Sequence, residues 1–393
     1  ASNRLYEVLL APLASTLQGA SSWTVSTTGA LGTLPLSLLT TAPYRATPDP
    51  RLLFAEYQRA PWLNRQVAIA YNPSAMATIA LRKLPRGSDS RRVFFGVGDP
   101  QFGGQLVQAA GATRQVSTVP KNSVALRNMK IPRQEQQNRV TVSASDYAGQ
   151  LARPNERIEI ATDILAMADA AVEKRSMASH RPAEAVAIPD IPPLPDTRDE
   201  ILAIARSLGA DPRGDTVFGS DATRDRIMSM KLNDRRILAF ATHGLIPGDM
   251  PGLTQPALTM SYRKDPRDSL LTLEDILRLK LDADWVVLSA CNTGAADGLG
   301  GEAASGLGRG FFYAGSRALL LTHWPVESES AKRLVVEIFS RYSKNTSRAQ
   351  AVREASQSLI DAPGYLDPQT KKLLYSYAHP MFWAPYTLIG DSR

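Results

Sequence analysis

Residues 285–294 read Trp285-Val286-Val287-Leu288-Ser289-Ala290-Cys291-Asn292-Thr293-Gly294. Six apolar or small residues lead up to Cys291, the single cysteine of the 393-residue chain, and turn residues follow at once. A short apolar run bounded by turn residues is typical of a buried strand in a parallel sheet. We therefore expect a strand here, with Cys291 where that strand ends.

A second stretch has the same form. Residues 236–244 read Arg236-Ile237-Leu238-Ala239-Phe240-Ala241-Thr242-His243-Gly244, and His243 precedes Cys291 by 48 residues. Ligands of open α/β sheets bind beyond the carboxyl ends of the strands. Two neighbouring strands that end in His and Cys would therefore bring an imidazole and a thiol to one functional edge.

Strand and helix patterns alternate clearly from residue 197 onward. Repeated β-α units predict a doubly wound, mostly parallel α/β sheet of about six strands with helices on both faces. The main expected strands are residues 92–100, 216–218, 236–242, 285–290, 317–322 and 384–389, with a short strand at 257–261. Thr272-Leu273-Glu274-Asp275 predicts a capped helix start.

Three motifs carry a resemblance to a known family. They are residues 241–244 (ATHG), residues 288–294 (LSACNTG) and the closing residues 379–391 (HPMFWAPYTLIGD). Together they resemble the CHAT domain, a family of the caspase-like cysteine proteases with separase and the gingipains as distant relatives. The spacing of His243 and Cys291 agrees with the caspase spacing of about 50 residues. The resemblance implies a caspase-like fold and a cysteine endopeptidase, a hydrolase of bacterial signalling or defence systems.

His243 and Cys291 are the expected catalytic pair. A free thiol with a pKa near 8.5 is mostly protonated at neutral pH, whereas the thiolate is the nucleophile. An imidazole within reach can take the proton and later return it to a leaving amine. The resemblance further implies that the backbone N–H groups of Gly244 and Cys291 hold the oxyanion of the tetrahedral intermediate.

Two other functions stay open at this point. The first is a catalytically silent caspase-like module that uses the groove to bind a partner peptide. The presence of both His243 and Cys291 argues against it, and the rate of thiol alkylation would separate it from a protease. The second is nucleic-acid binding, which predicts salt-dependent retention on DNA. A net charge of +7 with no run of five basic residues argues against it.

Substrate preference is the point on which the sequence says least. Asp297 and Glu302 follow the expected nucleophile, and Asp249 lies on the loop after His243. If one of these acids lines the first pocket, it would favour Arg or Lys in the substrate; the alternative is that they are solvated loop acids. His323 and Trp324 follow the strand at 317–322 and are candidates for peptide contact, with core packing as the alternative for Trp324.

The region before residue 92 is expected to be an N-terminal α+β accessory part of the CHAT domain. It contains a helix pattern at 1–20, strand patterns at 23–26, 31–36 and 67–71, and a helix pattern that ends near Leu84. The caspase-like core is expected at 92–393, with a long insertion at about 101–195. The proline-rich residues 188–195 end that insertion and read as an extended linker. The insertion is either a variable excursion or a segment that inhibits the groove.

Composition excludes several classes of site. A single cysteine allows no internal disulfide, and four scattered histidines show no metal-ligand spacing, so neither a metal nor another cofactor is expected. Glycines near residue 300 lack the Gly-Lys-Ser/Thr order of a phosphate loop. No apolar stretch is long enough to span a membrane. We expect a cytoplasmic protein with a protein or peptide substrate, regulated by a sensor or tetratricopeptide-repeat region upstream of Ala1.

Overall fold

The computed structural model describes the three main parts of the chain around two large gaps. The described residues are 1–27, 31–32, 34–85, 87–102, 191–247, 249–250, 252–263, 265–289, 306–324, 326–342, 344 and 346–393. Most of the expected insertion at 101–195 therefore lies outside the described residues, and only its first two and last five positions are placed.

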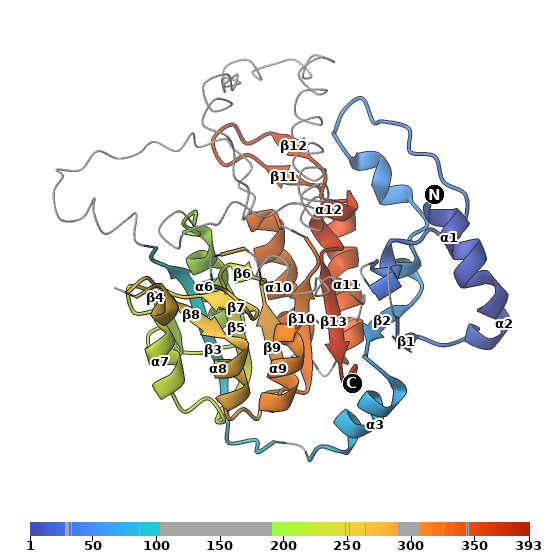
Figure 1. Cartoon of the computed structure of the whole chain (residues 1–393). Helices are drawn as coiled ribbons and strands as arrows, with labels where there is room; N and C mark the ends of the chain where they lie inside the picture. Colours follow the sequence, from blue (N-terminus) through green and yellow to red (C-terminus); the bar gives the residue numbers. More distant parts are fainter. Residues whose placement is uncertain are drawn as a thin grey trace.

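An eight-stranded sheet runs through the molecule (Figure 1). Its order is β1-β2-β13-β10-β9-β5-β3-β4, and only β10 and β13 pair antiparallel. The mixed α/β class and the mostly parallel sheet are confirmed. The strands are β1 (Ser22–Val25), β2 (Ala68–Tyr71), β3 (Arg92–Pro100), β4 (Thr216–Gly219), β5 (Arg235–Ala241), β9 (Trp285–Leu288), β10 (Ala318–Thr322) and β13 (Tyr386–Gly390).

Counted over the described residues, the sheet has two strands more than the six expected. Six strands come from residues after 91, and β1 and β2 come from the N-terminal region. β2 pairs with β13, and all four residues of β2 are buried. The physical reason is that β13 needs a partner on the side away from β10, since an open edge would leave its backbone groups unpaired.

Helices cover both faces of the sheet. α6 (Asp196–Ser207), α10 (Ser328–Tyr342) and α11 (Arg348–Asp361) pack on one face, whereas α7 (Arg224–Ser229), α8 (Leu273–Arg278) and α9 (Gly306–Ala314) pack on the other. The strands supply both cores because side chains alternate between faces: Trp285 and Val287 belong to one apolar cluster, Val286 and Leu288 to the other. Continuous apolar runs are what such a doubly covered sheet requires.

The N-terminal region is partly helical and partly irregular. The expected helix at 1–20 is broken into α1 (Ser2–Leu9), the 3₁₀ turn η1 (Ala11–Leu13) and α2 (Ala14–Leu17). The strand expected at 31–36 is wrong: its last residue starts the 3₁₀ turn η3 (Leu36–Leu38), and Pro35 has no N–H to donate to a ladder. The 3₁₀ turns η4 (Ala55–Arg59) and η5 (Leu63–Arg65) precede β2, and α3 (Ala75–Lys83) follows it.

Two small sheets lie beside the large one in the described part of the chain. β6 (Gly244–Leu245), β7 (Ala257–Thr259) and β8 (Leu270–Thr272) form one antiparallel sheet directly after His243, with the 3₁₀ turn η10 (Pro266–Ser269) before β8. β11 (Tyr365–Leu366) and β12 (Leu373–Tyr375) form the other, followed by α12 (Pro380–Trp383). The expected cap of α8 is confirmed, since Thr272 and Asp275 form a capping box. Within the described part of the chain, no helix is both long and apolar enough to cross a membrane.

Candidate functional site

His243 lies just past the carboxyl end of β5 and is 3% exposed. Its Nε2 is 2.7 Å from the carbonyl oxygen of Pro192, and its ring lies against Phe102 with 5.6 Å between the ring centroids. A carbonyl oxygen can only accept a hydrogen bond, so Nε2 carries the proton in this arrangement. The neutral imidazole then has Nδ1 as its basic nitrogen.

The backbone at His243 is held by the neighbouring strand β7. The His243 carbonyl accepts from the Thr259 N–H at 2.9 Å and from Thr259 Oγ1 at 3.3 Å. Thr242 Oγ1 in turn donates to the Thr259 carbonyl at 2.7 Å. Thr242 and Thr259 are both almost fully buried, so this network is shielded from water. The network fixes the direction in which the chain leaves His243.

The strand that leads to Cys291 lies directly beside β5. β5 and β9 pair from Ile237↔Trp285 to Phe240↔Leu288, and the Ser289 N–H continues the ladder to the Phe240 carbonyl at 3.0 Å. The Ser289 hydroxyl is 2.9 Å from the Tyr386 hydroxyl at the start of β13. Figure 1 shows β5 and β9 side by side in the middle of the sheet. Cys291, Asp297 and Glu302 lie outside the described residues.

Asp249 has a structural role in the loop after β6. Its Oδ2 accepts the Ile246 N–H at 2.9 Å, and its own N–H donates to the Ile246 carbonyl at 3.1 Å. Burial raises the pKa of Asp249, and the bond from Ile246 opposes that rise. The carboxylate therefore closes a turn of this loop. Its predicted role in recognising a basic substrate stays untested.

His323 and Trp324 follow β10, the strand on the other side of β9. The His323 N–H donates to the Pro385 carbonyl at 3.0 Å, and the side chain is 3% exposed. Trp324 packs against the larger apolar cluster, and its Nε1 is 3.4 Å from the Met381 carbonyl. This contact fits the core-packing alternative for Trp324. Peptide contact by either residue stays a prediction.

Glu327 begins the next helix from a buried position. Its two carboxylate oxygens accept the N–H groups of Glu329 at 3.0 Å and Ser330 at 2.7 Å, at the start of α10. Burial raises its pKa, and these hydrogen bonds oppose the rise. The N-terminus of a helix favours a negative charge, which explains why a carboxylate is tolerated there.

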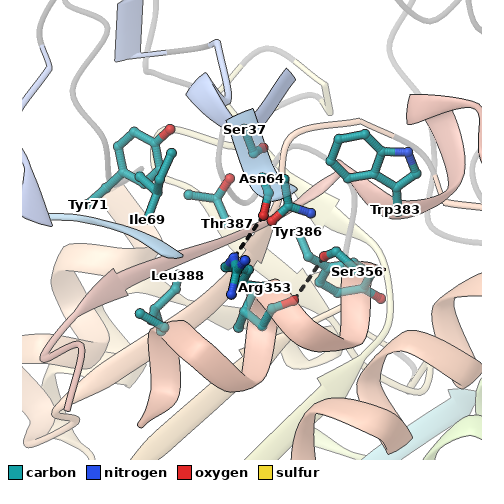
Figure 2. A pocket seen from close by; sticks show the side chains of 12 residues that line it. Ser37, Asn64, Ile69, Tyr71, Arg353, Ser356, Trp383, Tyr386, Thr387 and Leu388 are labelled. Carbon is teal, nitrogen blue, oxygen red and sulfur yellow. Dashed lines mark hydrogen bonds between the residues drawn. The ribbon is translucent and has the colours of Figure 1, made fainter. Parts of the chain in front are cut away.

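A small cavity of about 30 Å³ lies away from His243, between β2, β13 and α11 (Figure 2). It has room for one or two water molecules and is too small for a bulky peptide side chain. Arg353 crosses it to donate to the Asn64 carbonyl at 2.9 Å, and Tyr386 links its wall to Ser289. The lining residues are Ser37, Asn64, Ile69, Tyr71, Ala349, Val352, Arg353, Ser356, Trp383, Tyr386, Thr387 and Leu388.

Pro192 is a contact of His243 that sequence reasoning missed. Residues 188–195 read as a linker because four of their eight positions are proline. Yet Ile191 and Leu194 are buried, and the Leu194 carbonyl accepts from Thr197 Oγ1 at 2.7 Å, which ties the segment to the start of α6. The apolar residues between the prolines were the available signal.

Among the described residues, no group of three His, Cys, Asp or Glu side chains is arranged to hold a metal ion.

Comparison with known proteins identifies the family. A family model described as the CHAT domain matches residues 1–391. A search of curated proteins finds no match to the chain. The family match covers both the N-terminal strands and the edge of the sheet at which His243 lies. Because it spans nearly every residue, the chain belongs to the CHAT domain family.

Proposed function

We propose that the protein is a caspase-like cysteine endopeptidase in which His243 and Cys291 form a catalytic dyad. The observation that carries this proposal is the Pro192–His243 hydrogen bond at the carboxyl end of β5. It directs Nε2 toward the protein and assigns the basic role to Nδ1. An imidazole held in one tautomer is what a general base requires.

The position of β9 supports the second half of the dyad. Ser289 is held to β5 through its N–H and approaches β13 through its hydroxyl. Cys291 is two residues further along the chain, and two trans peptide units span at most about 7 Å. We therefore propose that the thiol acts at the same edge of the sheet as His243.

The direction of the Gly244 amide supports the oxyanion site. The His243 carbonyl faces β7, because it accepts the Thr259 N–H. Successive residues of a strand point their backbone groups to opposite sides, so the Gly244 N–H points away from β7. That donor lies outside the β6–β7 ladder and next to the proposed base. The Cys291 N–H is the second proposed donor.

The proposed reaction follows from these positions. His243 Nδ1 takes the Cys291 thiol proton, and the thiolate attacks the carbonyl carbon of the scissile peptide. The Gly244 and Cys291 amides stabilise the oxyanion, and the imidazolium returns the proton to the leaving amine as the C–N bond breaks. Water, deprotonated by His243, then cleaves the thioester and regenerates the thiol. The Pro192 carbonyl stabilises the imidazolium through the Nε2 proton.

The lone cysteine allows a direct test of the dyad. Every alkylated thiol in this chain is Cys291, so a reaction rate with iodoacetamide reports on that residue alone. We expect the wild-type rate to rise with an apparent pKa at least about one unit below 8.5, and His243→Ala to restore a pKa near 8.5. His379→Asn, which changes a histidine outside the site, should leave the profile unchanged. A wild-type profile identical to that of His243→Ala would contradict the dyad.

A peptidase assay tests the reaction itself. We expect a fluorogenic peptide library, varied at the residue before the scissile bond, to be cleaved by the wild type and by neither Cys291→Ala nor His243→Ala. The preferred residue tests the predicted roles of Asp249, Asp297, Glu302, His323 and Trp324. A slow-reacting Cys291 together with an inactive wild type would favour the silent, peptide-binding module instead. Control by an upstream sensor or partner stays a prediction from the family resemblance.

A further inference from the structure

An apolar surface adjoins His243 on the side of the small sheet. The buried floor of this surface consists of Phe102, Ile191, Leu253, Ala257 and Leu270, all less than 10% exposed. Three further side chains pack against this floor and remain partly exposed: Leu245, Met250 and Tyr262. We call these three residues the apolar rim. They are candidates to contact a substrate, because their outer surfaces reach solvent.

The apolar rim is continuous with the proposed catalytic base. Phe102, which belongs to the buried floor under the rim, contacts the His243 ring. Leu245 of the rim is two residues past His243 on β6. Leu245 is in register with the buried Ala257 of β7. Tyr262 is placed beside Phe102, because its N–H donates to the Gln101 carbonyl at 2.7 Å. The rim therefore begins within two residues of the group that must reach the substrate.

The chemistry of the reaction says which part of a substrate lies here. His243 returns a proton to the leaving amine, and that nitrogen must come within about 3 Å of the imidazole. The nitrogen belongs to the residue that follows the scissile bond. Its side chain starts one bond further on, close to the neighbours of His243. We infer that Leu245, Met250 and Tyr262 form a subsite that selects an apolar side chain at the residue after the scissile bond.

This inference rests on the proposed function and adds a specificity to it. Asp249, the charged residue of the same loop, does not oppose an apolar side chain strongly, because its Oδ2 already accepts the Ile246 N–H. The Asp249 side chain is also half-buried, and this burial raises its pKa. Apolar contact area, and not charge pairing, is then the main source of selectivity on this side.

The test separates binding from cleavage. A library of synthetic peptides with every residue type at each position is passed over immobilised Cys291→Ala protein, and the retained peptides are sequenced. We expect enrichment of Leu, Ile, Met or Phe at one position. The double variants Cys291→Ala/Leu245→Ser and Cys291→Ala/Met250→Gln should lose about tenfold of that enrichment. Cys291→Ala/Thr254→Ser, which changes an exposed residue of the same loop, is the matched control and should keep it.

Cleavage of the retained peptides by the wild type then locates the scissile bond. The inference requires the enriched apolar residue to follow that bond directly. Enrichment of Lys or Arg in place of an apolar residue, no enrichment at all, or an apolar residue located before the bond would each overturn it. Apolar enrichment that depends on Leu245 and Met250 without any cleavage would support the subsite and contradict the peptidase. Thermal unfolding of each variant confirms that it is folded.

Discussion

Two histidines of this chain differ because of what surrounds each ring. His243 donates from Nε2 to a carbonyl, which gives it a defined tautomer. His379 instead packs between the rings of Phe54 and Tyr57, with 4.8 Å between centroids in each case, and its Nδ1 accepts the Met381 N–H at 3.3 Å. Burial lowers the pKa of His379 to about 4. Its neutral form is therefore part of the fold.

This pKa predicts acid sensitivity. In the unfolded chain His379 takes up a proton as the pH falls through 6.5, whereas the folded protein resists protonation until about pH 4. The unfolded state is thus favoured progressively between these two pH values. The upper limit of this loss of unfolding free energy is about 3 kcal/mol, and the partial exposure of the ring makes the loss smaller. We expect His379→Asn, which retains a capping oxygen, to show a shallower loss of stability over pH 6.5–4 in urea unfolding. Equal slopes for the two proteins would contradict this.

At the scale of elements, the connections between helices and strands depend on particular backbone conformations. Gly315 joins α9 to β10 with φ at +115°, and a Cβ there would lie 2.2 Å from the Leu281 carbonyl oxygen. The Leu281 N–H donates to the Ala314 carbonyl at 2.8 Å, so the two chain segments are already held together. Gly209, after α6, also has a positive φ of +66°, but a Cβ added there would have no other atom within 4 Å.

The two glycines form a matched pair for a stability measurement. Gly209→Ala adds only the left-handed backbone strain and should cost about 1 kcal/mol of unfolding free energy. Gly315→Ala adds a clash with the Leu281 backbone, which cannot move aside without breaking its hydrogen bond to Ala314, and should cost more than about 2 kcal/mol. Urea unfolding at pH 7 measures both. Similar losses of unfolding free energy in the two variants would mean that the backbone at Leu281 can shift without destabilising the fold.

At the scale of the whole molecule, the N-terminal region and the rest of the chain share one sheet. β2 pairs with both β1 and β13, and Asn72 Nδ2 donates to the Gly390 carbonyl at 3.1 Å. By contrast, α1, η1 and α2 contain no buried residue, and Leu5 and Val8 are 40% and 67% exposed. These turns are held at the surface by hydrogen bonds from Ser2 and Asn3 to the Leu38 and Thr40 carbonyls, whereas β1 and β2 are strands of the main sheet.

Two truncations test this division. Removing residues 1–72 takes away β1 and β2 and exposes the edge of β13, so we expect aggregation or loss of a cooperative thermal transition. Removing residues 1–21 takes away helical turns that contain no buried residue and are attached through Ser2, Asn3 and Tyr6, so it should weaken the transition far less. If the chain that starts at residue 73 unfolds as cooperatively as the full chain, the N-terminal region is a separate unit, and the predicted boundary at residue 92 gains support.

The local elements were largely predictable, because they depend on short-range patterns. The runs at 92–100, 236–241 and 285–288 read as buried strands, since their central positions are apolar or small, as a sheet covered on both faces requires. The Thr272–Asp275 cap also followed from residue types at a fixed spacing. The extra strands of the sheet did not, because the pairing of β2 with β13 joins Tyr71 to Ile389, from opposite ends of the chain.

The sequence by itself determined the family, the main strands of the core and the presence of His243 at a strand end, because each follows from neighbouring residues. Only the tertiary structure decided what His243 touches. The Pro192 carbonyl is 51 residues away along the chain, and every residue carries such a carbonyl, so no side chain marks this one as the partner. The apolar rim has the same origin: Leu245, Met250 and Tyr262 meet only because β6, β7 and residues 101–102 converge beside one ring.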